Sequence, residues 1–236
     1  MMGGLLQHIK RHPGLYNFLR YGLYARLRSA NRTKVFQQIY ERNLWDGELS
    51  VSGPGSSLES TFTLRQELPR LIESLQVRSF LDIPCGDFQW MKDTPLGVDE
   101  YIGADIVLDM VEKNQRDFGA PGRKFVRLDL LADALPTTDL VFCRDCMVHL
   151  SFREIKQAFK SIANAGPKYL MLTTFPEHKK NEDTVTPYWR ALNFRIEPFN
   201  FPEPIRLIKD FADTQRDHHG KYLGVWRTDE LGSALR

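Results

Sequence analysis

Residues 78–88 read Arg-Ser-Phe-Leu-Asp-Ile-Pro-Cys-Gly-Asp-Phe, and this stretch decides the fold. Its first part, Arg78 to Ile83, is a short apolar run of the kind that forms a buried strand. An acid and a glycine, Asp82 and Gly86, stand where the chain leaves that strand and turns. The pattern predicts the first strand of an open α/β sheet, with its turn at the edge where such sheets bind ligands.

Short apolar runs and helical spacing alternate along the rest of the chain. Helical spacing covers Glu59 to Leu75, Leu108 to Phe118 and Phe152 to Ala165, and strand-like runs cover Tyr101 to Ile106, Lys124 to Asp129, Thr138 to Arg144 and Lys168 to Thr174. Two late runs, Ile205 to Phe211 and Lys221 to Trp226, are typical of a closing antiparallel pair. We therefore expect an α/β fold whose sheet is mostly parallel, with helices on both faces.

Aspartates end the first three predicted strands, at Asp82, Asp105 and Asp129. A carboxylate after the second strand is placed to accept both hydroxyls of a ribose. A single aspartate at such a place is as often a helix N-cap or turn residue, but three in succession favour a ligand site. Pro84 and Phe88 stand where a dinucleotide fingerprint has glycine, which disfavours a pyrophosphate cradle for NAD or FAD.

With these residues the chain resembles the class I S-adenosylmethionine-dependent methyltransferases, from about Glu59 to Trp226. The resemblance rests on Leu81-Asp82-Ile83-Pro84-Cys85-Gly86, Gly103-Ala104-Asp105-Ile106 and Leu128-Asp129-Leu130. It implies a Rossmann-like seven-stranded methyltransferase fold that uses S-adenosylmethionine and releases S-adenosylhomocysteine. It also implies that Asp82, Cys85 and Gly86 hold the amino acid part of the cofactor, Asp105 the ribose and Asp129 the adenine. Further cofactor contacts on this basis are Pro84, Ile106, Leu130 and Arg144.

Two segments precede this domain of residues 59–236. Residues 45–58 are rich in glycine and serine, which suits either a plain linker or a lid over the cofactor. The segment before the first helix often closes on the cofactor in the family that the chain resembles, so we favour a lid. Its predicted cofactor contacts are Trp45, Ser52, Gly53 and Gly55.

Residues 1–44 form a basic extension. The first 40 residues carry seven basic side chains and no acid, while the rest carry 25 basic and 30 acidic ones. Apolar positions between Leu15 and Leu27 have helical spacing. A basic amphipathic helix binds anionic membranes in some proteins, and in others it packs on its own domain with its arginines in water; we favour the second.

The residues after the fourth predicted strand suggest transfer chemistry. Asp145 and His149 are four apart, so a helical turn would place both on one side of the pocket. Histidine titrates near neutral pH and suits the general base that a hydroxyl acceptor needs. We predict His149 as the base and Asp145 as its orienting partner or an acceptor ligand. The alternative for His149 is a structural role, either as a cap of the helix that begins near Ser151 or packed under the adenine.

A metal site is not favoured. The Asp/His pair needs help from Asp87 or His178 to hold a divalent ion, and no third ligand is clear. Cys143 and Cys146 have zinc-like spacing, but a structural site needs four ligands and only Cys85 remains.

The polar segment from Thr173 to Phe201 is the candidate acceptor region. Its aromatic and polar side chains suit a sugar, and we predict substrate contacts at Tyr188, Trp189, Arg190 and Asn193. For any one of them a place on a surface loop whose aromatic rings fill small core clusters is the slightly favoured alternative. Interspersed acids leave no continuous positive stripe, so nucleic acid is not favoured.

Composition bounds the function classes. The chain is 42% apolar and 26% charged, as in globular proteins, and no uncharged stretch exceeds ten residues. Three cysteines and the lack of a secretory pattern favour a cytoplasmic protein. We predict O-methylation of a small or glycan-like hydroxyl acceptor. The alternatives are N-methylation of a small metabolite or protein group, and a catalytically silent scaffold that binds the cofactor.

Overall fold

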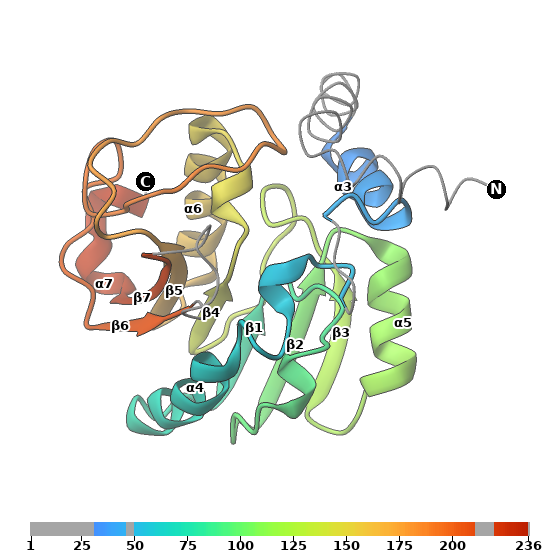
Figure 1. Ribbon diagram of the computed structural model, residues 1–236. Helices are drawn as coiled ribbons and strands as arrows, with labels where there is room; N and C mark the ends of the chain where they lie inside the picture. The colour runs from blue at the N-terminus through green and yellow to red at the C-terminus, as the bar shows by residue number, and fades with distance from the viewer. Residues whose placement is uncertain (1–30, 46–49, 211–219, 236) are drawn as a thin grey trace.

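A seven-stranded sheet forms the centre of the computed structural model, which describes residues 31–45, 50–210 and 220–235 (Figure 1). Its strands are β1 (Ser79–Asp82), β2 (Glu100–Asp105), β3 (Arg123–Arg127), β4 (Leu140–Cys143), β5 (Tyr169–Thr174), β6 (Arg206–Lys209) and β7 (Tyr222–Arg227). Their spatial order is β3-β2-β1-β4-β5-β7-β6. Strands β1 to β5 pair in parallel, and β7 pairs antiparallel with β5 and β6. The predicted fold class is confirmed.

Five α-helices and four 3₁₀ turns surround the sheet in the described part of the chain. They are α3 (Arg32–Glu41), η1 (Pro54–Ser56), α4 (Phe62–Ser74), η2 (Met91–Asp93), α5 (Leu108–Phe118), η3 (Met147–His149), α6 (Phe152–Ala165), α7 (Thr228–Leu231) and η5 (Gly232–Leu235). The bounds of α5 and α6 are those that the spacing predicts. Both ends of α6 have clear sequence signals. Ser151 and Glu154 form a capping box at its start, and Gly166, with φ 63°, ends it.

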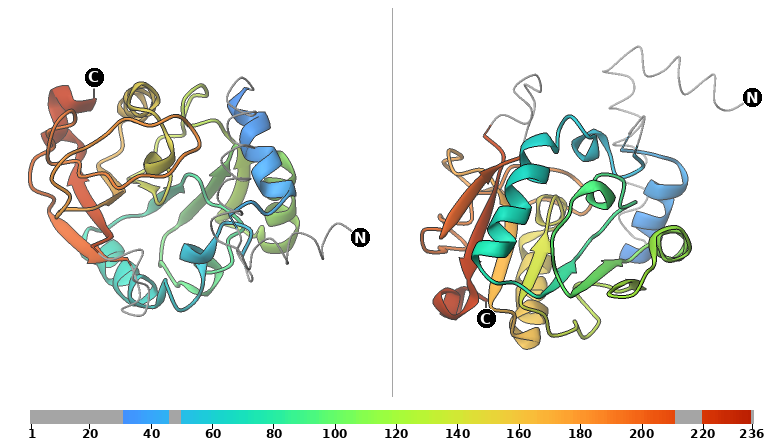
Figure 2. Two further views of the ribbon diagram at one scale, coloured as in Figure 1. Left: turned by 45° about the horizontal axis from the view of Figure 1, so that its top comes forward. Right: turned by 90° about the horizontal axis from the view of Figure 1, so that it is seen from below.

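Helices cover both faces of the sheet. Alternate side chains of β1 point to opposite faces, so Phe80 packs in the cluster that contains α4 and α5, and Leu81 in the cluster that contains α6. In the left view of Figure 2, α4 and α6 lie on opposite sides of the sheet. The central strands β1 and β4 are apolar and covered on both faces, so the polar side chains that they offer to a ligand lie at their ends.

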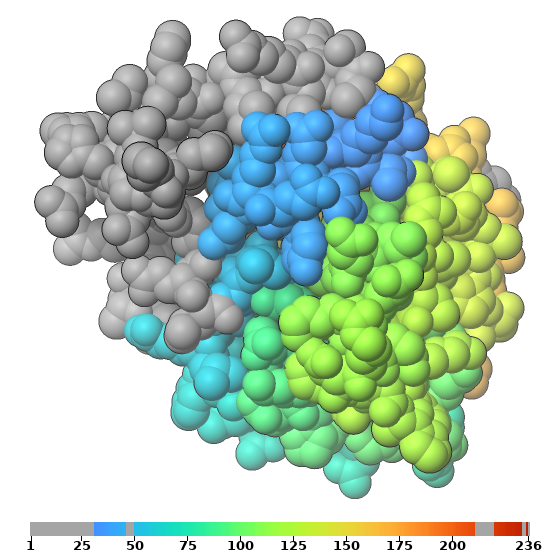
Figure 3. All heavy atoms as spheres, turned by 90° about the vertical axis from the view of Figure 1, so that its right-hand side faces the viewer, coloured from blue at the N-terminus to red at the C-terminus, as the bar shows by residue number. Residues whose placement is uncertain are grey.

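Helix α3 lies against α5 (Figure 3). Val35, Ile39 and Leu44 bury its apolar side in a small cluster, and Gln37 Nε2 donates to Asp109 Oδ2 at 2.9 Å. The predicted helix between Leu15 and Leu27 falls outside the described residues. None of the helices within the described ranges is long and apolar enough to cross a membrane.

The chain between β5 and β6 is a long loop. Residues 175–205 contain no helix or strand and are held together by side-chain amides. Asn193 Nδ2 donates to the carbonyl oxygens of Pro176 (2.9 Å) and His178 (3.0 Å), and Asn181 Nδ2 donates to the carbonyl of Asn193 (2.8 Å). The loop therefore has a fixed internal structure.

Candidate functional site

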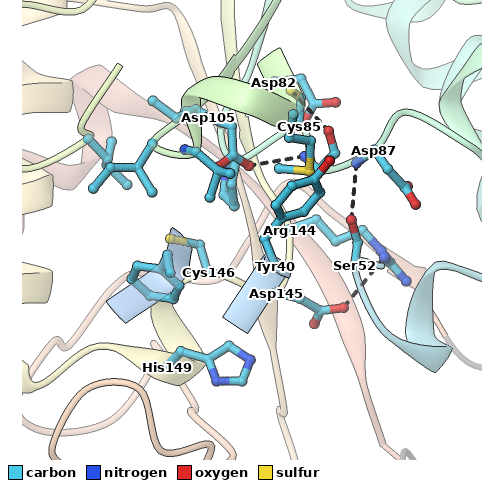
Figure 4. Close-up of a pocket in the computed structure, with 18 of the residues that line it drawn as sticks. Tyr40, Ser52, Asp82, Cys85, Asp87, Asp105, Arg144, Asp145, Cys146 and His149 are labelled. Atoms are coloured by element: carbon cyan, nitrogen blue, oxygen red, sulfur yellow. Dashed lines mark hydrogen bonds and ion pairs between the residues drawn. The ribbon is translucent and has the colours of Figure 1, made fainter. Parts of the chain in front are cut away.

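A pocket lies at the carboxyl ends of β1, β2 and β4, between α3 and the loop of residues 50–57 (Figure 4). Its lining includes most of the predicted site residues: Trp45, Ser52, Asp82, Pro84, Cys85, Gly86, Asp105, Ile106, Asp129, Leu130, Arg144, Asp145 and His149. Gly53 and Gly55 are not among the lining residues. Parallel strands bring these turns to one edge because their carboxyl ends all point the same way.

Asp82 is the last residue of β1 and is 2% exposed. The Tyr101 hydroxyl donates to Asp82 Oδ2 at 2.5 Å. Burial is the larger influence and raises the pKa of Asp82 to about 7, although this hydrogen bond favours the ionised form. Asp82 is therefore a buried acid that titrates close to neutral pH.

Asp105 ends β2, and backbone amides hold its carboxylate. Gly86 N donates to Oδ2 at 3.2 Å and Val107 N to Oδ1 at 3.1 Å. Burial raises the pKa of Asp105 to about 6, so it is mostly ionised at neutral pH. No cationic side chain in the described part of the chain forms an ion pair with it, which leaves its oxygens able to accept further hydrogen bonds.

The turn after β1 is closely joined to the loop of residues 50–57. Gly86 has φ 57°, and a Cβ there would lie 2.3 Å from Ser52 Oγ, so only glycine fits. Asp87 N donates to Ser52 Oγ at 3.0 Å, and Val51 N donates to Asp87 Oδ2 at 3.0 Å. The described part of the predicted lid thus rests on the pocket, while residues 46–49 fall outside the described ranges.

Asp129 lies two residues beyond the end of β3, since that strand is shorter than the sequence predicts. Leu131 N donates to Asp129 Oδ1 at 2.9 Å, and Arg32 Nη2 donates to Oδ2 at 2.7 Å. Arg32 begins α3 and also reaches Glu154 at 3.5 Å. We expected the arginines of the extension to lie in water, but the Arg32 side chain is only 24% exposed because these acids pair with it.

Arg144 is part of a buried ionic cluster of two cations and two acids. Its Nε and Nη2 each donate to Asp210 at 2.9 Å, and Nη2 also donates to the carbonyl of Gly55 at 2.7 Å. Lys221 Nζ lies 2.6 Å from Asp145 Oδ2 and 3.2 Å from Asp210 Oδ2. The cluster joins the loop of residues 50–57 to the turn after β4 and to the ends of β6 and β7.

Asp145 does not have the geometry that its spacing from His149 predicts. It stands before η3 with φ 53°, outside any helical turn. Burial alone would raise the pKa of Asp145, but Lys221 and Arg144 outweigh it and hold the pKa well below its usual range. Within the described ranges no hydrogen bond joins Asp145 to His149.

His149 ends η3 and is held in one tautomer. Its Nδ1 lies 3.1 Å from the carbonyl oxygen of Pro187, which only accepts, so Nδ1 carries the proton and Nε2 is the basic atom. The ring stacks on Trp45 with centroids 5.3 Å apart. Burial lowers the pKa of His149, so the ring is neutral at neutral pH.

The four predicted acceptor residues lie outside the pocket lining. Arg190 donates to the carbonyl oxygens of Met147 (2.8 Å) and Leu150, which fixes η3. Asn193 holds the loop after β5 together, and Tyr188 packs against the apolar cluster of α3. Trp189 is 47% exposed. Arg190 therefore holds η3 in place, and Asn193 holds the loop after β5. Trp189 lies at the surface.

Sequence reasoning missed the contribution of α3. Arg32, Phe36 and Tyr40 line the pocket from this helix, and Trp90 and Met110 are among its further lining residues. The spacing of four residues along α3 was a signal for one helix face. No group of three or more metal-ligating side chains occurs among the residues that the structure describes.

No family model and no curated protein sequence matches the chain, but many solved structures do. Human N-acetylserotonin methyltransferase with bound S-adenosylmethionine has a TM-score of 0.53 at 10% identity, over 71% of this chain and 52% of that one. Magnesium protoporphyrin IX methyltransferase from Synechocystis PCC 6803 has a TM-score of 0.50 at 15% identity, and the match covers 87% of this chain and 95% of that one. PigF with bound S-adenosylhomocysteine has a TM-score of 0.50 at 16% identity, and the match covers 71% of this chain and 55% of that one.

This chain therefore spans little more than half the length of the human protein and of PigF. At these identities the likeness concerns the fold. The fold is that of the class I S-adenosylmethionine-dependent methyltransferases, as the sequence resemblance implies.

Proposed function

We propose that this protein is an S-adenosylmethionine-dependent methyltransferase that methylates a hydroxyl oxygen of a small or glycan-like acceptor. The observation that carries the proposal is the pocket, where the buried carboxylates of Asp82, Asp105 and Asp129 converge at the ligand-binding edge of a methyltransferase fold. Their chemistry suits a ligand with an ammonium group, a ribose diol and an aromatic amine.

The residues present fit this cofactor. At Gly86 a side chain would occupy the space beside Ser52, so the bare backbone keeps the turn open to the ligand. Asp105 is 5% exposed yet receives only backbone amides among its described partners, so it has acceptor capacity for hydroxyls. When bound, the cofactor supplies an electrophilic methyl group on its sulfonium. Positioning of the acceptor then accounts for most of the catalysis.

His149 is the proposed general base. Pro187 fixes its tautomer, Trp45 packs on its face and a lowered pKa keeps it neutral, so Nε2 is ready to take the hydroxyl proton of the acceptor. Asp145, held ionised by Lys221, is proposed to accept a hydrogen bond from a second acceptor hydroxyl. Of the two roles that the sequence allows for Asp145, this proposal takes the acceptor ligand and leaves out the orienting partner.

An acceptor with several hydroxyls fits the lining best. The rings of Tyr40, Trp45 and Trp90 line the same pocket as the Asp145 carboxylate, and aromatic rings together with a polar group are the combination that sugars use. The names of the human and Synechocystis neighbours also give small-molecule acceptors. For the loop after β5 we propose only that it borders the acceptor. This loop contains Tyr188, Trp189, Arg190 and Asn193.

Calorimetric titration with S-adenosylmethionine and S-adenosylhomocysteine tests the proposal. Wild type should bind both, and Asp105→Ala should bind about 100-fold more weakly because two charge-assisted hydrogen bonds are lost. The matched control is Asp99→Ala, an exposed acid whose carboxylate lies 3.6 Å from Arg78, which should leave affinity unchanged. Absence of binding by wild type, with and without a divalent metal, would refute the assignment.

A further inference from the structure

Arg32 places a guanidinium in the wall of the pocket. It lies at the start of α3, outside the domain that carries the sequence resemblance, and lines the pocket beside Phe36. Its Nη2 donates to Asp129 Oδ2 at 2.7 Å and its Nη1 lies 3.5 Å from Glu154 Oε1. The side chain is therefore held at the residue to which the adenine end of the cofactor is assigned.

One donor of this guanidinium is unused. Arg32 Nε is shielded from water and has no hydrogen-bond partner among the described residues. Buried donors almost always have an acceptor, because leaving one unpaired is unfavourable. An acceptor atom on a ligand in the pocket would satisfy it.

The pair of Asp129 and Arg32 offers an acceptor and a donor side by side. Adenine presents the complementary pattern on one edge, where the N6 amine donates and the neighbouring ring nitrogen N7 accepts. The Asp129 oxygen bound by Arg32 still has a lone pair, because a carboxylate oxygen accepts more than one hydrogen bond.

We infer that Arg32 is a cofactor-binding residue that reads adenine together with Asp129: Asp129 accepts from N6 and the Arg32 guanidinium donates to N7. The inference rests on the proposed function. It makes α3 part of the binding site rather than a neighbouring appendage. If Arg32 contacts N7, then loss of that contact lowers the affinity only for ligands that have a nitrogen at this position.

The test compares two ligands with two proteins by calorimetry. The ligands are S-adenosylhomocysteine and its 7-deaza analogue, in which a C–H replaces N7. Wild type should bind the analogue about tenfold more weakly, since a charge-assisted hydrogen bond is lost. Arg32→Met should bind S-adenosylhomocysteine about tenfold more weakly and should no longer distinguish the two ligands.

Lys34→Met is the matched control, because Lys34 is an exposed cation on the same helix. It should bind both ligands as wild type does. Thermal unfolding without ligand checks that α3 remains in place. If Arg32→Met does not fold, Arg32→Lys retains a cation against Asp129 but lacks Nε, and the same comparison applies.

Three results would decide against the inference. Equal discrimination against the 7-deaza ligand by wild type and Arg32→Met would mean that Arg32 does not contact N7. Tighter binding by Arg32→Met would mean that Arg32 competes with the ligand for Asp129. Wild type that binds S-adenosylhomocysteine and does not distinguish the analogue would also exclude the contact, whereas wild type that binds neither ligand would overturn the proposed function itself.

Discussion

The two sides of the pocket are built in different ways. On the side of β1 and β2, Asp82 and Asp105 end their strands, and the amides of the adjoining turns fix the Asp105 carboxylate. On the side of β4, His149 and Asp145 depend on Pro187 and Lys221, which are 38 and 76 residues further along the chain. The comparison shows that the role of a residue is easiest to predict from its type where neighbouring backbone groups also fix the position of its side chain.

The largest expected effect is on catalysis and concerns the β4 side of the pocket alone. Replacing His149 by Ala should lower kcat by about 100- to 10,000-fold, because the general base is lost, while cofactor affinity is unchanged. In wild type the acid limb of the pH–rate profile should lie below 6.5, the ordinary pKa of histidine, since burial lowers the pKa of His149. His178→Ala, outside the pocket lining, should behave as wild type. Full activity of His149→Ala would point to an amine acceptor that needs no base.

The next largest effect concerns the cluster that joins the two sides. Arg144→Met should lower the free energy of unfolding by about 3 to 5 kcal/mol, because Asp210 would remain buried without its bidentate partner. Arg206→Met is the surface control, since the Arg206 side chain is 62% exposed and lies 3.9 Å from Glu67. Urea denaturation measures both. A small loss for Arg144→Met would show that the two sides hold together without this ion pair.

A smaller effect separates structural from accessible residues in the loop after β5. Asn193→Ala should cost about 2 kcal/mol of stability, because two loop carbonyl oxygens lose their donor. Trp189→Ala, at the exposed side chain of the same loop, should change stability by less than about 1 kcal/mol. Chemical denaturation distinguishes them. Equal losses would contradict the internal structure that we assign to this loop.

The smallest expected effect is on stability and concerns Asp82 on the β1 side of the pocket. The pKa of Asp82 is about 7 in the folded protein and lies above its unfolded value, so the proton bound to Asp82 stabilises the fold at acid pH. That stability is lost as the pH rises through about 7. Asp82→Asn should therefore raise the stability of the ligand-free protein by about 1 kcal/mol near pH 8, and weaken cofactor binding. Asp99→Asn should do neither. Thermal scans across pH that show no change would contradict the raised pKa.

The sequence predicts the fold and the β1 side well because both depend on local patterns. The bounds of Leu108–Phe118 and Phe152–Ala165 follow from apolar spacing and caps, and every predicted strand is found. Arg32 was beyond such reasoning because its partner Asp129 is 97 residues away. Arg190 was misleading for a related reason: its type suits substrate binding, but distant carbonyl oxygens use its donors.

The ionic cluster of Arg144, Asp145, Asp210 and Lys221 also has a consequence for the growing chain during synthesis. A nascent chain that has emerged only as far as β5 has Arg144 and Asp145 but neither Asp210 nor Lys221. In such a chain Arg144 still has Asp145 nearby, at 3.5 Å, but lacks the bidentate contact with Asp210, and Asp145 lacks Lys221. Long-range closures of this kind are slow compared with local helix formation. The ionic cluster beside the pocket is therefore complete only when the residues that border β6 and β7 are present.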